Sequence, residues 1–152
     1  MAAGLLGARV VVESWDIETL PDYFANLIVS GNIANTDWMT AQRDHVLRVL
    51  RPWGGTVCLS VNWGGEISWI KVVRGALEGA GSWTQQYCDP QNTACSGDEL
   101  VDGPLGILWF GEPGPQGMVE RHGNAQSPVS MDGRLFVQGE ERIMAVDAFN
   151  GT

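Results

Sequence analysis

The pattern of apolar and polar positions divides the chain into two parts with different periods. In the first part, apolar runs at residues 9–13, 24–30 and 56–61 have the short length and β-branched content of buried strands. Apolar residues recur at helical spacing over 40–51 and 66–77, beside charged positions. Strands that alternate with helices predict parallel pairing, so we expect an α/β unit built on a partial parallel sheet.

The second part loses the helical period. An apolar run at 105–110 predicts one short strand, and runs at 127–131, 134–139 and 142–147 predict three more. An Asp-Gly and a Glu-Glu dipeptide separate the last three strands, and Asp-Gly is typical of tight hairpin turns. We therefore expect an antiparallel β meander, which is the unit of a β-propeller blade.

Composition and charge narrow the function classes. Apolar residues make up 44% of the chain and charged residues 18%, as in a globular protein with a hydrophobic core. The net charge is −9, and residues 75–120 contain no Lys or Arg, so we expect no nucleic acid as a partner. No apolar run is long enough to span a bilayer, and the first residues do not resemble a signal peptide. The sequence does not decide whether the protein lies in the cytoplasm or in the periplasm.

The three cysteines, an odd number, exclude a framework made only of intramolecular disulfides. Cys58 lies in an apolar run and is expected to be a small buried side chain. Cys88 and Cys95 lie in a polar loop, and their spacing allows a loop disulfide. The same spacing does not match the short Cys-x2-4-Cys pattern of zinc sites, and we expect no metal.

Ligands of parallel α/β sheets bind at the carboxyl ends of the strands. The polar residues expected there are Asp16, Ser30, Asn32 and Asn62. The Asp16 carboxylate could accept a hydrogen bond from an amine or hydroxyl group of a ligand. The alternative is that Asp16 caps the turn that follows it. The spacing leaves both interpretations open.

Three segments of the first part occur in a characteristic order: WDIETLP at 15–21, YFANLIVS at 23–30 and HVLRVLRPWGG at 45–55. Together they resemble the later half of a class I S-adenosylmethionine-dependent methyltransferase. This resemblance implies a Rossmann-like sheet over residues 1–80. It also implies a contact of Asp16 with the adenine, and cofactor-binding positions at Ile17 and Ser30.

The first part departs from this family in ways that affect cofactor binding. Asn26 and Trp53 stand where Asp and Gly are more usual. The glycine-rich loop that holds the methionine portion, and the acidic residue that binds the ribose, have no counterpart, because the Gly-Leu-Leu-Gly at 4–7 follows no strand. We therefore expect this chain alone to bind S-adenosylmethionine weakly or not at all.

The second part has its own resemblance. SPV at 127–129, DGRLFV at 132–137 and AVDAFNG at 145–151 resemble one repeat of the pyrroloquinoline-quinone (PQQ)-type β-propellers. This implies an incomplete repeat over 126–152, after a connecting segment, 81–125, that carries the first blade strand. No specific residue supports bound PQQ.

Arg121 and His122 are polar residues of the connecting segment. They either line a pocket at the propeller mouth or form a surface loop.

The order of the two parts resembles large bacterial proteins of the planctomycete type, in which a methyltransferase-like domain precedes a quinoprotein-like propeller. The chain would then be a junction fragment, and its partners would be the remaining domains of the parent chain. Two hypotheses follow. The parent is a methyltransferase, or its α/β part is a degenerate remnant beside a propeller that acts as a binding scaffold or a quinone-dependent dehydrogenase. The oligomeric state stays open.

Overall fold

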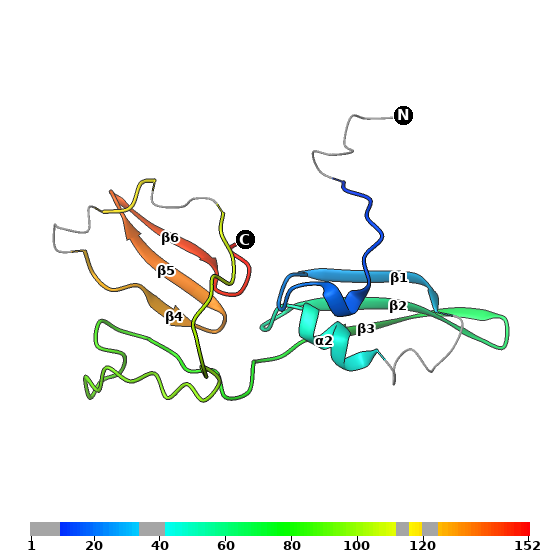
Figure 1. Ribbon diagram of the computed structural model, residues 1–152, viewed down its shortest axis with the longest axis horizontal. Coiled ribbons are helices and arrows are strands. Elements are labelled where there is room, and N and C mark those ends of the chain that lie inside the picture. The colour runs from blue at the N-terminus through cyan, green and yellow to red at the C-terminus, as the bar shows by residue number, and fades with distance from the viewer. Residues whose placement is uncertain (1–9, 34–41, 112–115, 120–124) are drawn as a thin grey trace.

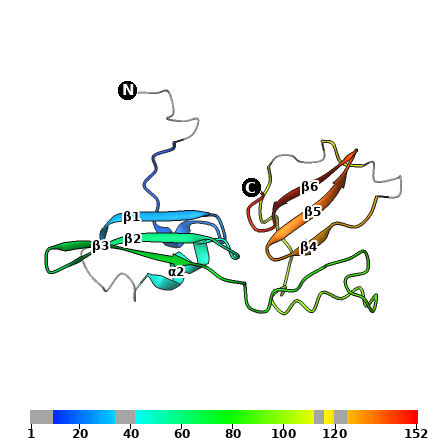
Figure 2. The same cartoon turned by 180° about the vertical axis from the view of Figure 1, so that it is seen from behind.

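The structure is a computed structural model that describes residues 10–33, 42–111, 116–119 and 125–152. In these ranges the chain is mostly β with little helix, and two separate three-stranded sheets lie side by side (Figure 1, Figure 2). The first sheet contains, in spatial order, β1 (Leu27–Ile33), β2 (Thr56–Trp63) and β3 (Glu66–Val73). The second contains β4 (Val129–Met131), β5 (Arg134–Gly139) and β6 (Arg142–Asp147).

The α/β expectation is confirmed for one parallel pair and its helix. β1 and β2 pair in parallel, and α2 (Arg43–Val49) lies between them in sequence. The helix ends at Val49, and Leu50 is already extended. Arg51 precedes Pro52, and because a residue before a proline disfavours helical dihedrals, the helix does not continue through Arg51. The Arg74 guanidinium donates to the carbonyl oxygens of Leu47 and Leu50, which α2 leaves without partners.

The hydrophobic core lies on one face of the first sheet. Its buried side chains are Val46, Leu50, Val57 and Leu59. Three partly buried side chains pack against them: Ile17, Ile28 and Leu47. Alternation along β1 and β3 turns Leu27, Val29, Ile67 and Trp69 to the opposite face, where all four side chains are exposed. In the described ranges, α2 covers one face of the sheet, and these four exposed side chains lie on the other.

The predicted helix over 66–77 is wrong, because most of this segment forms β3, antiparallel to β2. Gly64 and Gly65 close the hairpin with φ values of 63° and 103°. A two-residue loop with positive φ at both positions matches the twist of the flanking strands. Apolar residues at 67, 70 and 73 fit the period of a helix, but the same segment can also be extended as a strand. Backbone pairing with β2 selects the strand.

Two further predicted strands are absent from the described residues. Residues 11–13 and 105–110 have no strand structure, although both are rich in apolar side chains. Phe110 is 93% exposed and Val12 is 77% exposed. A strand requires a neighbouring backbone to satisfy its N–H and C=O groups, and apolar content does not supply one.

The antiparallel meander of the second part is confirmed. β4, β5 and β6 pair in sequence order, and the β4–β5 hairpin closes through Asp132 and Gly133, with φ of 52° and 73°. Trp83 extends the sheet beyond β4 through two backbone hydrogen bonds with Ser130, of 2.8 and 2.7 Å. Among the described residues, no apolar side chain of β4–β6 is fully buried. The meander therefore has a thinner core than the first sheet.

The Gly-Gly hairpin gives a test of β3. We expect Gly65→Val to lower the free energy of unfolding by about 1–3 kcal/mol, because a β-branched residue is strained at positive φ. Urea unfolding followed by circular dichroism measures this. The matched control is Gly75→Ala, where an added Cβ meets nothing within 4 Å. Equal stability of the two variants would contradict the hairpin.

Candidate functional site

Asp16 and Ile17 lie in a short 3-10 turn ahead of β1. Asp16 is the N-cap of η1 (Ile17–Thr19), and its backbone oxygen accepts hydrogen bonds from the Thr19 N–H at 3.0 Å and hydroxyl at 2.7 Å. The exposed Asp16 carboxylate makes no capping hydrogen bond. The turn is therefore held by the backbone, and it does not use the Asp16 side chain.

Hydrogen bonds of Arg48 connect this turn to the end of α2. Its guanidinium donates to the backbone oxygens of Leu20 at 2.7 Å, Ile17 at 3.0 Å and Glu18 at 3.1 Å. It also forms an ion pair with Asp22. The end of α2 lies beside Ala25, whose N–H donates to the Val49 oxygen. The turn with Ile17 is therefore held near the amino end of β1.

Ser30 lies further along β1, towards its carboxyl end. It is partly buried and opposite Leu59 of β2. Ser30 is five positions after Ala25, which corresponds to about 16 Å along an extended strand. No hydrogen bond among the described residues joins Ser30 to Asp16 or Ile17. The cofactor role of these three residues stays a prediction.

The other polar residues predicted at the strand ends lie within strands. Asn62 belongs to β2, and its side-chain oxygen accepts a hydrogen bond from the Gly65 N–H at 2.8 Å, so it supports the hairpin. Asn32 belongs to β1. Arg121 and His122 lie outside the described residues.

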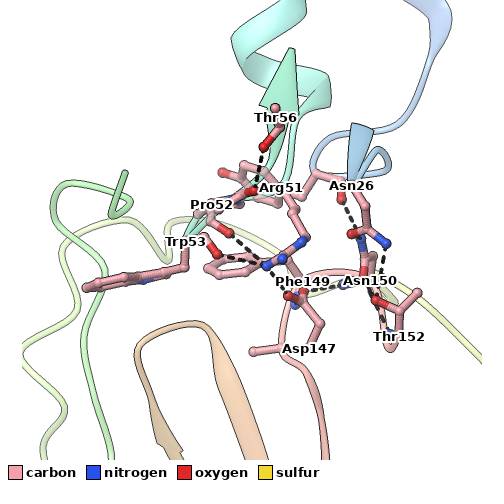
Figure 3. Close-up of polar contacts among 12 residues, drawn as sticks. Asn26, Arg51, Pro52, Trp53, Thr56, Asp147, Phe149, Asn150 and Thr152 are labelled. Carbon is pink, nitrogen blue, oxygen red and sulfur yellow. Dashed lines mark hydrogen bonds and ion pairs between the residues drawn. The ribbon is translucent and has the colours of Figure 1, made fainter. Parts of the chain in front are cut away.

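A different cluster joins the two sheets, and the sequence analysis did not single it out. We call it the joint (Figure 3). Its members from the first part are Tyr23, Asn26, Arg51 and Trp53, and those from the second part are Gly133, Asp147, Phe149, Asn150 and Thr152.

A largely buried ion pair lies at the centre of the joint. Arg51 Nη1 is 2.7 Å from Asp147 Oδ2, and the side chains are 21% and 5% exposed. The second carboxylate oxygen, Oδ1, accepts the backbone N–H groups of Phe149 at 2.9 Å and Asn150 at 3.2 Å. Arg51 also donates to the Trp53 oxygen at 2.9 Å. The Asp147 charge thus has the partners that a buried carboxylate needs.

A contact between two aromatic rings lies beside the ion pair in the joint. The rings of Tyr23 and Phe149 meet edge to face, with centroids 5.2 Å apart and planes at 67°. The Arg74 guanidinium lies over the Tyr23 ring, with Cζ 5.2 Å from the ring centroid. Burial lowers the pKa of Arg74, and its proximity to Tyr23 and Asp22 opposes that change.

Amide hydrogen bonds and close packing complete the joint. Asn150 Nδ2 donates to Asn26 Oδ1 at 2.8 Å. A Cβ added at Gly133 would lie 2.7 Å from the Trp53 ring, and one at Gly151 would lie 2.4 Å from Trp109. Both positions have positive φ, so any other residue would be strained as well as crowded.

The cysteines are free thiols, so the loop disulfide is absent from this structure. Cys88 is buried, whereas Cys58, expected to be buried, is only partly so. The Cys88 thiol donates to the Cys95 backbone oxygen at 2.9 Å. Burial raises the pKa of Cys88, and the neighbouring charge of Asp89 adds to the effect. Within the described ranges, no group of three or more His, Cys, Asp or Glu could hold a metal ion.

Comparison of the chain with models of known protein families, with curated proteins and with solved structures found no match. The two family resemblances of the sequence therefore stay predictions. In the part of the chain that the structure describes, no helix is long and apolar enough to cross a membrane.

The ion pair of the joint gives a second test. We expect Arg51→Met to lower the free energy of unfolding by about 3 kcal/mol, because it leaves the Asp147 charge buried without its partner. Urea unfolding measures the change. The matched control is Asp22→Asn, which removes an exposed ion pair and should cost about 0–1 kcal/mol. A loss in Arg51→Met no larger than in the control would contradict a stabilising joint.

Proposed function

We propose that this chain is the junction module of a multidomain protein and that its role is structural. In this proposal, a methyltransferase-like α/β part and a PQQ-like propeller part are held in a fixed relation. The remaining domains of the parent chain are its partners. The single observation that carries the proposal is the largely buried Arg51–Asp147 ion pair, which joins the two sheets.

The positions of the two charges support a built junction. Arg51 belongs to the LRPWGG turn that ends α2, and Asp147 belongs to the AVDAFNG segment that ends β6. Each lies in a motif on which the family resemblance of its own part of the chain rests. Removing two charges from water is unfavourable unless they pair with good geometry and further hydrogen bonds. The joint supplies both for the Asp147 carboxylate, and Arg51 Nη1 also donates to the Trp53 oxygen, whereas Arg51 Nε is buried without a hydrogen-bond partner among the described residues.

Exposed apolar surface supports contact with further protein. The face of the first sheet opposite α2 carries Ile67 and Trp69, which are 69% and 61% exposed. On the second sheet, a hollow of about 140 Å³ lies over β5 and β6. Its lining is apolar: Trp109, Phe110, Gly111, Met118, Leu135, Val137, Met144 and Val146. Surfaces of this kind mark contacts with other polypeptide, here the remaining domains of the parent chain.

Two observations favour the second candidate, a methyltransferase. The Asp16 carboxylate is exposed and is not used by its own turn, so it is available to a ligand. The parallel β1–β2 pair with α2 is also the arrangement that the resemblance implies. For a quinone-dependent dehydrogenase, no described residue supplies a comparable argument.

Titration of S-adenosylmethionine into the chain separates the candidates. For the structural role we expect no measurable heat in calorimetry and no effect of Asp16→Ala, because the loop that holds the methionine portion has no counterpart here. Micromolar binding that Asp16→Ala removes would favour the methyltransferase. Glu13→Ala, an exposed acidic residue shortly before the turn, is the control that should leave such binding unchanged.

Hydrogen exchange tests the junction itself. We expect Arg51→Met to speed backbone exchange in peptides that cover 20–30 and 143–152, one on each side of the joint, because opening would expose both. The control Glu78→Gln, which changes an exposed side chain outside both peptides, should exchange like the unmodified chain. Unchanged exchange on both sides in Arg51→Met would overturn the proposed junction.

A further inference from the structure

We propose that Asn150 is a modification site: deamidation of the Asn150–Gly151 pair opens the joint irreversibly. Asn150 is the only asparagine in the chain that glycine follows. A following glycine leaves the backbone nitrogen sterically accessible to the asparagine side chain. The inference rests on the joint that carries the proposed function, and it does not depend on what either part of the chain binds.

The reaction needs only water as a co-reactant. The Gly151 backbone nitrogen attacks Cγ of Asn150, so that a nitrogen–carbon bond forms and the bond from Cγ to Nδ2 breaks. Nδ2 leaves as ammonia, and it takes up the proton lost from the Gly151 nitrogen. Water then opens the five-membered imide at either carbonyl carbon. The product carries Asp or isoaspartate at position 150.

The closed joint restrains both reacting groups. The Gly151 N–H donates to the Asp147 backbone oxygen at 2.9 Å, which keeps the nucleophile engaged. The leaving group, Asn150 Nδ2, donates to Asn26 Oδ1 at 2.8 Å and to the Tyr23 oxygen at 3.4 Å. The reaction therefore requires that the joint open first, and its rate follows the population of the open state.

The product does not fit the closed joint. A carboxylate at position 150 would face the Tyr23 carbonyl oxygen, to which Asn150 now donates. It would also add a negative charge beside Asp147, whose Oδ1 already accepts the backbone N–H of residue 150. Isoaspartate lengthens the backbone by one carbon next to Gly151, which packs tightly against Trp109. Each consequence favours the open state, so the modification acts in one direction.

The rate of modification is measured by peptide mapping. Trypsin cleaves after Arg142, and the peptide 143–152 contains no side-chain amide except that of Asn150. At mildly alkaline pH we expect Arg51→Met to deamidate several-fold faster than the unmodified chain, and the chain in urea to react fastest. The Asp22→Asn control should react at the unmodified rate. Equal rates in the folded chain and in urea would overturn the inference.

The effect on the joint is measured with a variant that mimics the product. We expect Asn150→Asp to speed hydrogen exchange in peptides covering 20–30 and 143–152, whereas Asn92→Asp, in an exposed loop, leaves it unchanged. Unchanged exchange in Asn150→Asp overturns the inference, whatever Arg51→Met does. Failure of the junction proposal is a separate result, namely unchanged exchange in Arg51→Met.

Discussion

The buried charge of Asp147 is the constraint on which the arrangement of the two sheets depends. A carboxylate that is 5% exposed needs partners for both oxygens, and the turn that follows β6 supplies them for only one, Oδ1. The other partner, Arg51, comes from 96 residues earlier in the chain. The segment at the end of α2 and the end of β6 must therefore lie in contact. The aromatic and amide contacts of the joint gather around that meeting point.

The two sheets contribute unequally to this arrangement. The first sheet has a core of its own, in which Leu50 and Leu59 are almost completely shielded from water. The meander has no fully buried apolar side chain among its described residues, so contacts outside its own strands matter more to it. Trp109 illustrates this: its indole N–H donates to the Ala148 oxygen at 3.0 Å and its ring covers Gly151. The meander thus relies on the connecting segment and the joint for its packing.

Sequence periodicity predicted some elements well and others poorly, and the reasons differ. The meander followed from short apolar runs separated by turn dipeptides, both of which are local signals. The segment 66–77 satisfied helical spacing, but the Gly64–Gly65 turn and pairing with β2 made most of it a strand. The run at 105–110 has the composition of a strand, but it pairs with no strand in the described part of the chain. Where a backbone partner far away in the sequence decides whether a segment forms a strand, the local apolar pattern is not sufficient to predict it.

By itself, the sequence determined the parallel pair with its helix, the antiparallel meander and the motifs that contain Arg51 and Asp147. These features depend on residues close together in the chain: hydrophobic period, turn dipeptides and the proline after α2. Only the tertiary structure decided that the two motifs meet, because an ion pair across 96 residues leaves no local signal. It also placed Asp16 and Ile17 near the amino end of β1, through the hydrogen bonds of Arg48, while Ser30 lies further along the strand.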